Sequence, residues 1–251
     1  MKWTWFHKLG SPKPFYEISG RWLPYIATAA AILLCVGLVW GLAFSPPHSE
    51  QGNSYRIIYI HVPAAFAAQS CYLMIAVAGA VSWIWKMKMA DIALQQGAII
   101  GAWLTFVSLI TGSIWGKPTW GTYWIWDARL TSMLILLFLY FGIIALGQAI
   151  SNRESSAKAC AVLALVGAVN IPIIKYSVDM WNTLHQPATF SVTGKAEMDS
   201  QMWIPLLICV LGMYLFFAAI LLMRMRLEVL KRESRSSWVK AEVARLVGRL
   251  P

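Results

Sequence analysis

Six apolar runs, each long enough or nearly long enough to cross a bilayer, constrain this chain more than any other feature. Crossing the hydrocarbon core takes about 20 apolar residues in a helix. Hydrophobic residues make up 59% of the chain and charged residues only 13%. The sequence therefore predicts an all-α membrane protein, a single polytopic domain over residues 1–251. Its six transmembrane helices are expected at about residues 22–44, 58–84, 92–114, 130–150, 159–181 and 202–223.

The distribution of Lys and Arg predicts how the spans are oriented. If the N-terminus is cytoplasmic, the inner segments are 1–21, 86–91, 151–158 and 224–251, and they carry 16 of the 21 Lys and Arg residues. Such an excess marks the cytoplasmic side. We therefore expect both termini in the cytoplasm, with residues 224–251 as a basic tail. The net charge of +10 then indicates topology and contact with anionic membrane lipid, and not nucleic-acid binding.

A tryptophan-rich segment lies between the third and fourth spans, at residues 115–128. Gly116, Pro118 and Gly121 disfavour a continuous helix there, so we expect an outer-face loop. Such a loop suits a large flat ligand, although it is also compatible with an aromatic belt at the interface. Its aromatic residues are Trp115, Trp120, Tyr123, Trp124 and Trp126.

Two histidines are expected at the same outer face as this loop. His61 lies near the outer end of the second span and His185 follows the fifth, where it would share a helical face with Trp181 if that stretch were helical. Two imidazoles at one face can supply both axial ligands of an iron porphyrin. Taken singly, each histidine also fits an interfacial or hydrogen-bonded role.

Charged residues around the loop allow two interpretations. Arg56, Lys117 or Arg129 could donate charge-assisted hydrogen bonds to the propionates of a porphyrin. Asp127 precedes the fourth span and is a candidate N-cap, and Arg129 could instead anchor that helix at the headgroups.

The assembled motif W-G-x-x-x-W-G-x-x-W-x-W-D, followed by A-R-L-T, resembles the signature of the tryptophan-rich WWD family of haem-handling membrane proteins in cytochrome c biogenesis. The segments R-I-I-Y-I-H-V-P-A-A and Y-S-V-D-M-W-N-T-L-H-Q, with six spans, are similar to its haem exporter protein C (CcmC) branch. The resemblance covers nearly the whole chain.

The resemblance implies a haem-transfer protein, and not an enzyme, in the bacterial inner membrane. It implies that haem b binds non-covalently and transiently at the periplasmic face, with His61 and His185 as axial ligands. The Trp loop, including Tyr123 and Asp127, would form the cradle. The implied partners are the periplasmic haem chaperone CcmE, the ABC transporter subunits CcmA and CcmB, and the small membrane subunit CcmD.

Two other functions remain open at this point. A respiratory membrane subunit could use a quinone or haem for electron transfer, but no histidine is expected in the middle of a span. A solute transporter is the other alternative, and the spans are almost free of the charges that mark such pathways. No G-x-x-x-x-G-K-[ST] loop is present, so any ATP dependence must come from another chain.

Overall fold

The computed structural model describes residues 10–181, 183–185 and 198–248. The described chain is helical, and six of its helices are long and apolar enough to cross a membrane, which confirms the predicted fold class. These spans cover Pro12–Phe44, Asn53–Trp85, Lys88–Trp120, Ala128–Ala149, Arg153–Asp179 and Ser200–Arg232.

Three of the spans are built from more than one helical segment. The first joins α2 (Pro12–Val39) to a π-helical turn, η1 (Trp40–Phe44), and the second joins a 3-10 turn, η2 (Asn53–Ile57), to α3 (Ile58–Trp85). The fifth consists of α6 (Arg153–Gly167) and α7 (Asn170–Met180). The remaining helices are α4 (Lys88–Trp120), α5 (Ala128–Ala149), α8 (Ser200–Arg232) and a short final helix, α9 (Ser237–Val247).

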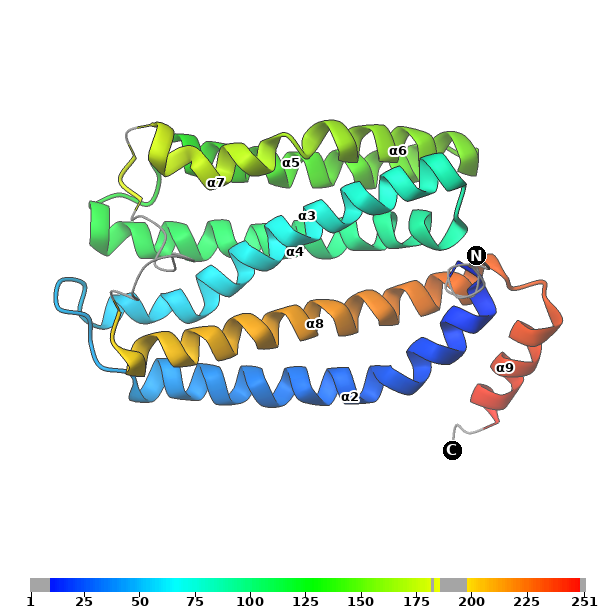
Figure 1. Ribbon diagram of the computed structural model, residues 1–251, viewed down its shortest axis with the longest axis horizontal. Coiled ribbons are helices and arrows are strands. Elements are labelled where there is room, and N and C mark those ends of the chain that lie inside the picture. The colour runs from blue at the N-terminus through cyan, green and yellow to red at the C-terminus, as the bar shows by residue number, and fades with distance from the viewer. Residues whose placement is uncertain (1–9, 182, 186–197, 249–251) are drawn as a thin grey trace, which may run out of the picture.

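The helices form two groups joined by α3 (Figure 1). In one group, α2 packs along α8; in the other, α5 packs against α4, α6 and α7. Helix α3 crosses between them and contacts α4, α6 and α8. The largest buried cluster lies around Tyr72 and Tyr140, where α3, α4, α5 and α6 meet, so the core is centred on the second group.

The break in the fifth span has a local cause near Pro172. Proline has no N–H to donate to the carbonyl of Ala168, and the N–H of Ile171 bonds to that carbonyl instead. The side chain of Asn170 then donates to the carbonyl of Ser132 at 2.8 Å, which ties the break to α5. The fifth span is thus interrupted just before the proline, between Gly167 and Asn170.

The region predicted as a basic tail begins as helix. Helix α8 continues to Arg232, so the first residues of the predicted tail 224–251 extend this helix. In α9, Val239 is buried and Trp238 packs beside Tyr16 of α2, at a ring-centroid distance of 5.7 Å. Helix α9 is therefore partly packed on the bundle, while residues 249–251 lie outside the described part of the chain.

The helix ends fall into two sets at opposite ends of the bundle (Figure 1). One end holds the turn between η1 and η2, the turn between α4 and α5, the end of α7 and the start of α8. The opposite end holds the α3–α4 turn, the α5–α6 turn and α9. We call the first the aromatic end and the second the basic end.

Candidate functional site

His61 lies in the first turn of α3, and the hydrogen bonds of its ring determine where its proton lies. Its Nδ1 is 2.9 Å from the carbonyl oxygen of Ser108 and 3.1 Å from the hydroxyl of Thr111, which itself donates to the carbonyl of Val107. A carbonyl oxygen only accepts, so Nδ1 carries the hydrogen. The lone pair of Nε2 is therefore not engaged by these contacts. A neutral imidazole in this tautomer can ligate a metal.

The glycine at position 112 makes room for this ring. A Cβ atom there would lie 2.9 Å from Cε1 of His61, closer than side chains normally approach. The imidazole thus rests directly on the backbone of α4. No sequence pattern pointed to Gly112 or to the Ser108 carbonyl, since both reach His61 only through the packing of α3 on α4.

His185 is held by the carboxylate that also begins α5. Its Nδ1 is 3.0 Å from Oδ2 of Asp127, whose Oδ1 accepts from the backbone N–H of Leu130 at 2.7 Å. The hydroxyl of Thr183 donates to the same Oδ2. Asp127 is thus the N-cap predicted from the sequence, and its second oxygen also orients His185. A carboxylate that accepts from Nδ1–H again leaves Nε2 with its lone pair, as in metal-ligating histidines.

The pKa values of His185 and Asp127 agree with a hydrogen on Nδ1 of His185 and a lone pair on its Nε2. Burial lowers the pKa of His185 below its ordinary value, although the Asp127 carboxylate opposes the shift. For Asp127, burial raises the pKa, but the hydrogen bonds from Thr183, Leu130 and His185 together bring it below the usual range. At neutral pH the pair is therefore a neutral imidazole donating to an ionised carboxylate.

His48, at the same end, has the opposite tautomer. Its Nδ1 accepts hydrogen bonds from the backbone N–H groups of Glu50 at 3.2 Å and Gln51 at 3.3 Å. Its neutral ring therefore carries the hydrogen on Nε2, where a metal would have to bind. The ring also stacks on Tyr55 at 4.8 Å. Hydrogen bonding thus distinguishes His61 and His185 from a third histidine nearby.

Two tryptophans of α4 pack against these two histidines. The ring centroid of Trp115 lies 5.7 Å from that of His61, and Trp120 lies 4.7 Å from His185, both edge to face. Helix α4 therefore places one indole against each of the two imidazoles.

The tryptophan-rich segment is more helical than the sequence predicts. Helix α4 continues through Trp115 and Pro118 to Trp120, so the predicted break at Gly116 is wrong and the loop spans only residues 121–127. Pro118 falls in the last turn, where the hydroxyl of Thr119 donates to the carbonyl of Trp115 at 2.8 Å. The helix ends at Gly121, whose φ of +79° few other residues tolerate.

The remaining aromatic residues lie in the loop itself. Trp124 and Trp126 pack edge to face at 5.5 Å, and Trp126 is 76% exposed. Tyr123 is also exposed, with the ammonium of Lys117 5.4 Å from its ring centroid. Nε1 of Trp124 is buried without a hydrogen-bond partner among the described residues. A buried indole donor of this kind is available to a ligand.

The two arginines predicted as propionate partners differ in their availability. Arg56 donates from Nη1 to the carbonyl of Leu42 at 2.9 Å and from Nη2 to that of Ser45 at 2.8 Å, which ties η2 to η1. Arg129 donates from Nε to the hydroxyl of Ser177 at 3.2 Å. Its guanidinium therefore keeps its Nη donors free of hydrogen bonds to described residues, and Arg129 is the better candidate for an anionic group.

The helical condition under which Trp181 and His185 would share a face is not met in the described residues. Helix α7 ends at Met180, Trp181 is extended with φ −133° and ψ 150°, and residues 183–185 are irregular. Trp181 and His185 thus do not share a helical face. Asp127 and Thr183, rather than helical periodicity, orient His185. Thr183 was missed because its contact with Asp127 joins residues far apart in the sequence.

Comparisons with a family model and with curated proteins point to the same family over nearly the whole chain. A family model described as Heme exporter protein C matches residues 5–240. Among curated proteins, Heme exporter protein C of Escherichia coli K12 is 48% identical over 237 residues, covering 94% of this chain and 96% of the relative. The protein of the same name from Haemophilus influenzae is 46% identical, covering 95% and 97%, and that from Bradyrhizobium diazoefficiens is 45% identical, covering 91% and 86%.

Proposed function

Since this chain belongs to the Heme exporter protein C family, as the family model and the relatives both show, we propose that it binds haem b without a covalent bond and passes it to a periplasmic haem chaperone. Family membership supports a role in haem handling for cytochrome c maturation by a multi-pass membrane component of an ABC-type haem exporter. It also indicates a handling component rather than an enzyme. The binding site, the carrier step and the partners are our proposal.

The proposal assigns the two iron ligands to His61 and His185. The observation that carries it is the shared tautomer: both rings donate from Nδ1 to fixed acceptors and leave Nε2 free, beside indoles of the same helix. Haem iron takes imidazole ligands, and the porphyrin supplies four nitrogens of its own. Two histidines are therefore a complete protein ligand set for haem iron.

The other residues are assigned by position. Trp115 and Trp120 would form the apolar walls, and the exposed rings of Tyr123 and Trp126, with the half-buried ring of Trp124, would cover the macrocycle. We assign a propionate to Arg129 in preference to Arg56, because both Nη atoms of Arg56 already donate to backbone carbonyls. Asp127 is a positioning residue that acts through His185.

The absorption spectrum of the purified full-length protein tests the ligand assignment. We expect a b-type haem spectrum, with haem that acid-acetone extracts, and its loss in the His61→Ala, His185→Ala double variant. Imidazole added to the double variant should restore part of the spectrum. The matched control is His48→Ala, a histidine of the same end with the other tautomer, and it should retain haem. Native haem content in the double variant would overturn the assignment.

Transfer to the chaperone, which we identify as CcmE, needs a separate test. Trp120→Ala or Trp124→Ala should weaken retention or delivery of haem without preventing membrane insertion, because each removes only part of the apolar wall. Delivery is measured as covalent haem on CcmE in cells that also contain CcmA, CcmB and CcmD. Delivery at the native rate by both variants would contradict the platform role. Rapid reduction of the bound haem by quinol would instead favour a respiratory subunit.

The proposed orientation places the aromatic end in the periplasm of a bacterial inner membrane. It rests on the excess of Lys and Arg in the segments of the basic end. Single cysteines at exposed Asn53 and at Ser234 probe the two ends in a background without native cysteines. We expect a membrane-impermeant maleimide to label position 53 in intact cells and position 234 only after lysis. The reverse pattern would overturn the orientation.

A further inference from the structure

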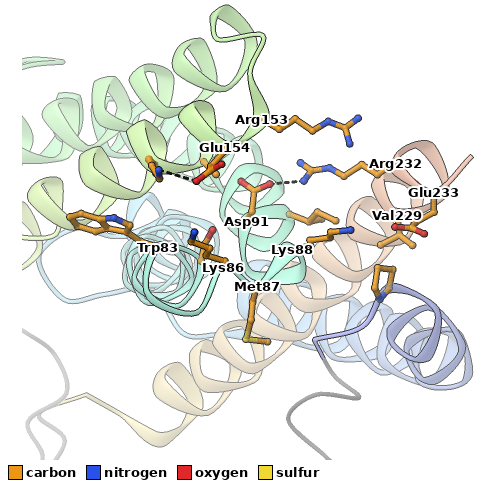
Figure 2. Close-up of a pocket in the computed structure, with 15 residues that line it drawn as sticks. Trp83, Lys86, Met87, Lys88, Asp91, Arg153, Glu154, Val229, Arg232 and Glu233 are labelled. Carbon is orange, nitrogen blue, oxygen red and sulfur yellow. Dashed lines mark hydrogen bonds and ion pairs between the residues drawn. The ribbon is translucent and has the colours of Figure 1, made fainter.

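The basic end of the bundle contains two neighbouring hollows, far from the histidines. The first has a volume of about 360 Å³ and lies between the α3–α4 turn, α6 and α8 (Figure 2). Its walls include the apolar side chains of Trp83, Ile92 and Val229. The second, of about 430 Å³, is formed by charged and hydroxyl side chains around the turn after α8. Because the two share Arg153, Arg232 and Glu233, they form one site with an apolar and a polar half.

The carboxylates of this site differ in how far they are already neutralised. Asp91 is buried and pairs with Arg232 at 2.5 Å, and Arg232 also binds Glu228 at 2.8 Å. Glu154 pairs with Lys158 at 3.0 Å. Only Glu233 has no side-chain ion pair among the described residues. The acidic groups at the wall are thus largely satisfied by their own cations.

Two cations at the same walls have no such partner. The side chains of Lys88 and Arg153 form no ion pair or hydrogen bond with the described residues. In Figure 2, Arg153 from α6 and Arg232 from α8 extend from opposite sides into the space between the two helices, with Lys88 from α4 nearby. Basic side chains outnumber acidic ones in both halves. The site therefore suits an anion.

Backbone strain at Lys86 is a second observation at the same place. Lys86 forms the left-handed end of α3, with φ +52°, and is the one non-glycine with positive φ in the described chain. Glycine would adopt this conformation at lower cost. The lysine side chain lines the apolar half. A strained position that keeps a long cationic side chain indicates a role for that side chain.

We propose that these hollows bind an anionic phospholipid of the leaflet at the basic end, with its phosphate at Arg153 and Lys88. Three observations favour a lipid over a soluble anion. The site joins a polar half to an apolar half, and it lies at the ends of membrane spans. The apolar surface of α3 beside it is also exposed, with Trp83 at 48%, Ile84 at 65% and Trp85 at 59%. Basic pockets between membrane helices on this side suit such headgroups.

Native mass spectrometry of the purified full-length protein tests the site. The protein is delipidated and offered phosphatidylglycerol or phosphatidylcholine at equal concentration. We expect retention of phosphatidylglycerol and little of phosphatidylcholine, whose headgroup has no net charge. Inorganic phosphate or glycerol phosphate at millimolar concentration should not displace the lipid. Displacement by either would identify a site for a soluble anion and would overturn the proposal.

Three variants separate this site from general attraction to the membrane. Arg153→Gln and Lys88→Gln should each lower phosphatidylglycerol retention about fivefold, the effect of one charge at a membrane surface. The matched control is Arg21→Gln, which removes an exposed cation near the same end outside the hollows and should have no effect. Equal loss in Arg21→Gln, or none in the first two, would overturn the proposal.

Lys86→Gly separates binding from folding. It relieves the left-handed strain, so its melting temperature should not fall, yet it removes a cation and should lower lipid retention. Retention at the native level in a stably folded Lys86→Gly protein would exclude a role for this side chain. The readouts are lipid binding and melting temperature, so they do not depend on whether the protein carries haem.

Discussion

The two ends of the bundle treat their polar side chains in opposite ways. At the centre of the basic end, Arg232 donates to Asp91, Glu228 and Gln95, which fastens α8 to α4, whereas Lys88 and Arg153 at its rim have no ion pair among the described residues. At the aromatic end, protein acceptors take only one nitrogen of His61 and His185, and the other keeps its lone pair. Of the three buried side-chain atoms without hydrogen-bond partners among the described residues, Arg56 Nε and Trp124 Nε1 lie there, and Ser156 Oγ lies at the basic end. Satisfied groups stabilise a fold, whereas groups with unused bonding capacity are available to a ligand.

The largest expected effect on stability comes from removing Arg232, the cation at the centre of the ion-pair cluster of the basic end. Arg232→Met should lower the free energy of unfolding by about 3–5 kcal/mol, because it leaves the buried carboxylate of Asp91 without its counter-ion. Lys158→Met, which breaks the exposed pair with Glu154, should cost at most about 1 kcal/mol. Thermal unfolding in detergent measures both. Equal losses in the two variants would contradict the structural role of Arg232.

At the aromatic end, Asp127→Asn should change ligand binding far more than stability. Asparagine caps helices as well as aspartate does, so α5 should persist. Its amide can present N–H to Nδ1 of His185, which would move the imidazole hydrogen to Nε2. We expect haem affinity to fall about 10- to 100-fold, as when other outer-shell partners of metal ligands are changed. Haem titration with parallel melting curves checks this, and Asp127→Ala, which also loses the cap, should lower both. Native affinity in Asp127→Asn would contradict the positioning role.

Gly112→Ala should have a smaller effect on the same readout. The added methyl would meet the ring of His61 at 2.9 Å and force it to shift, while alanine itself favours the helix. We expect roughly tenfold weaker haem binding, within the range that overpacking costs. The neighbouring Ser113→Ala serves as control and should bind normally. Tight binding in both would mean that the ring need not rest on α4.

The smallest expected effect is a pH dependence at His185. Because burial lowers its pKa in the folded protein, the unfolded chain takes up the proton first as pH falls below about 6.5. This contribution to the free energy of unfolding is thus complete above that pH and is lost below it. Asp127, whose pKa is also lowered, adds a further loss only below about pH 4. The His185→Gln variant should lack the loss of stability that begins below about pH 6.5. If the free energies of unfolding of the native protein and of this variant change in parallel with pH, the prediction is wrong.

Features of the fold and the site that depend on neighbouring residues could be predicted from the sequence. Contacts between residues far apart in the chain could not. The six spans follow from local composition, and the N-cap of Asp127 follows from its neighbours in the chain. The helix through Trp120 was missed because a proline in a last turn removes only one hydrogen bond, the one to the carbonyl of Ile114. The contact between Asp127 and His185 joins residues far apart in sequence, so only the packed bundle reveals it. For Arg56, charge alone suggested a ligand partner, whereas its position gives it backbone carbonyls.

The anchoring of both imidazoles through Nδ1 has a kinetic consequence for a carrier. Each ring is already oriented by folding, so accepting or losing cargo requires no search among side-chain rotamers and little entropy is lost at that step. Under the proposed ligand assignment, the barriers to loading and release would come mainly from the metal–ligand bonds and from apolar contact with the indoles, because the two imidazoles need no reorientation.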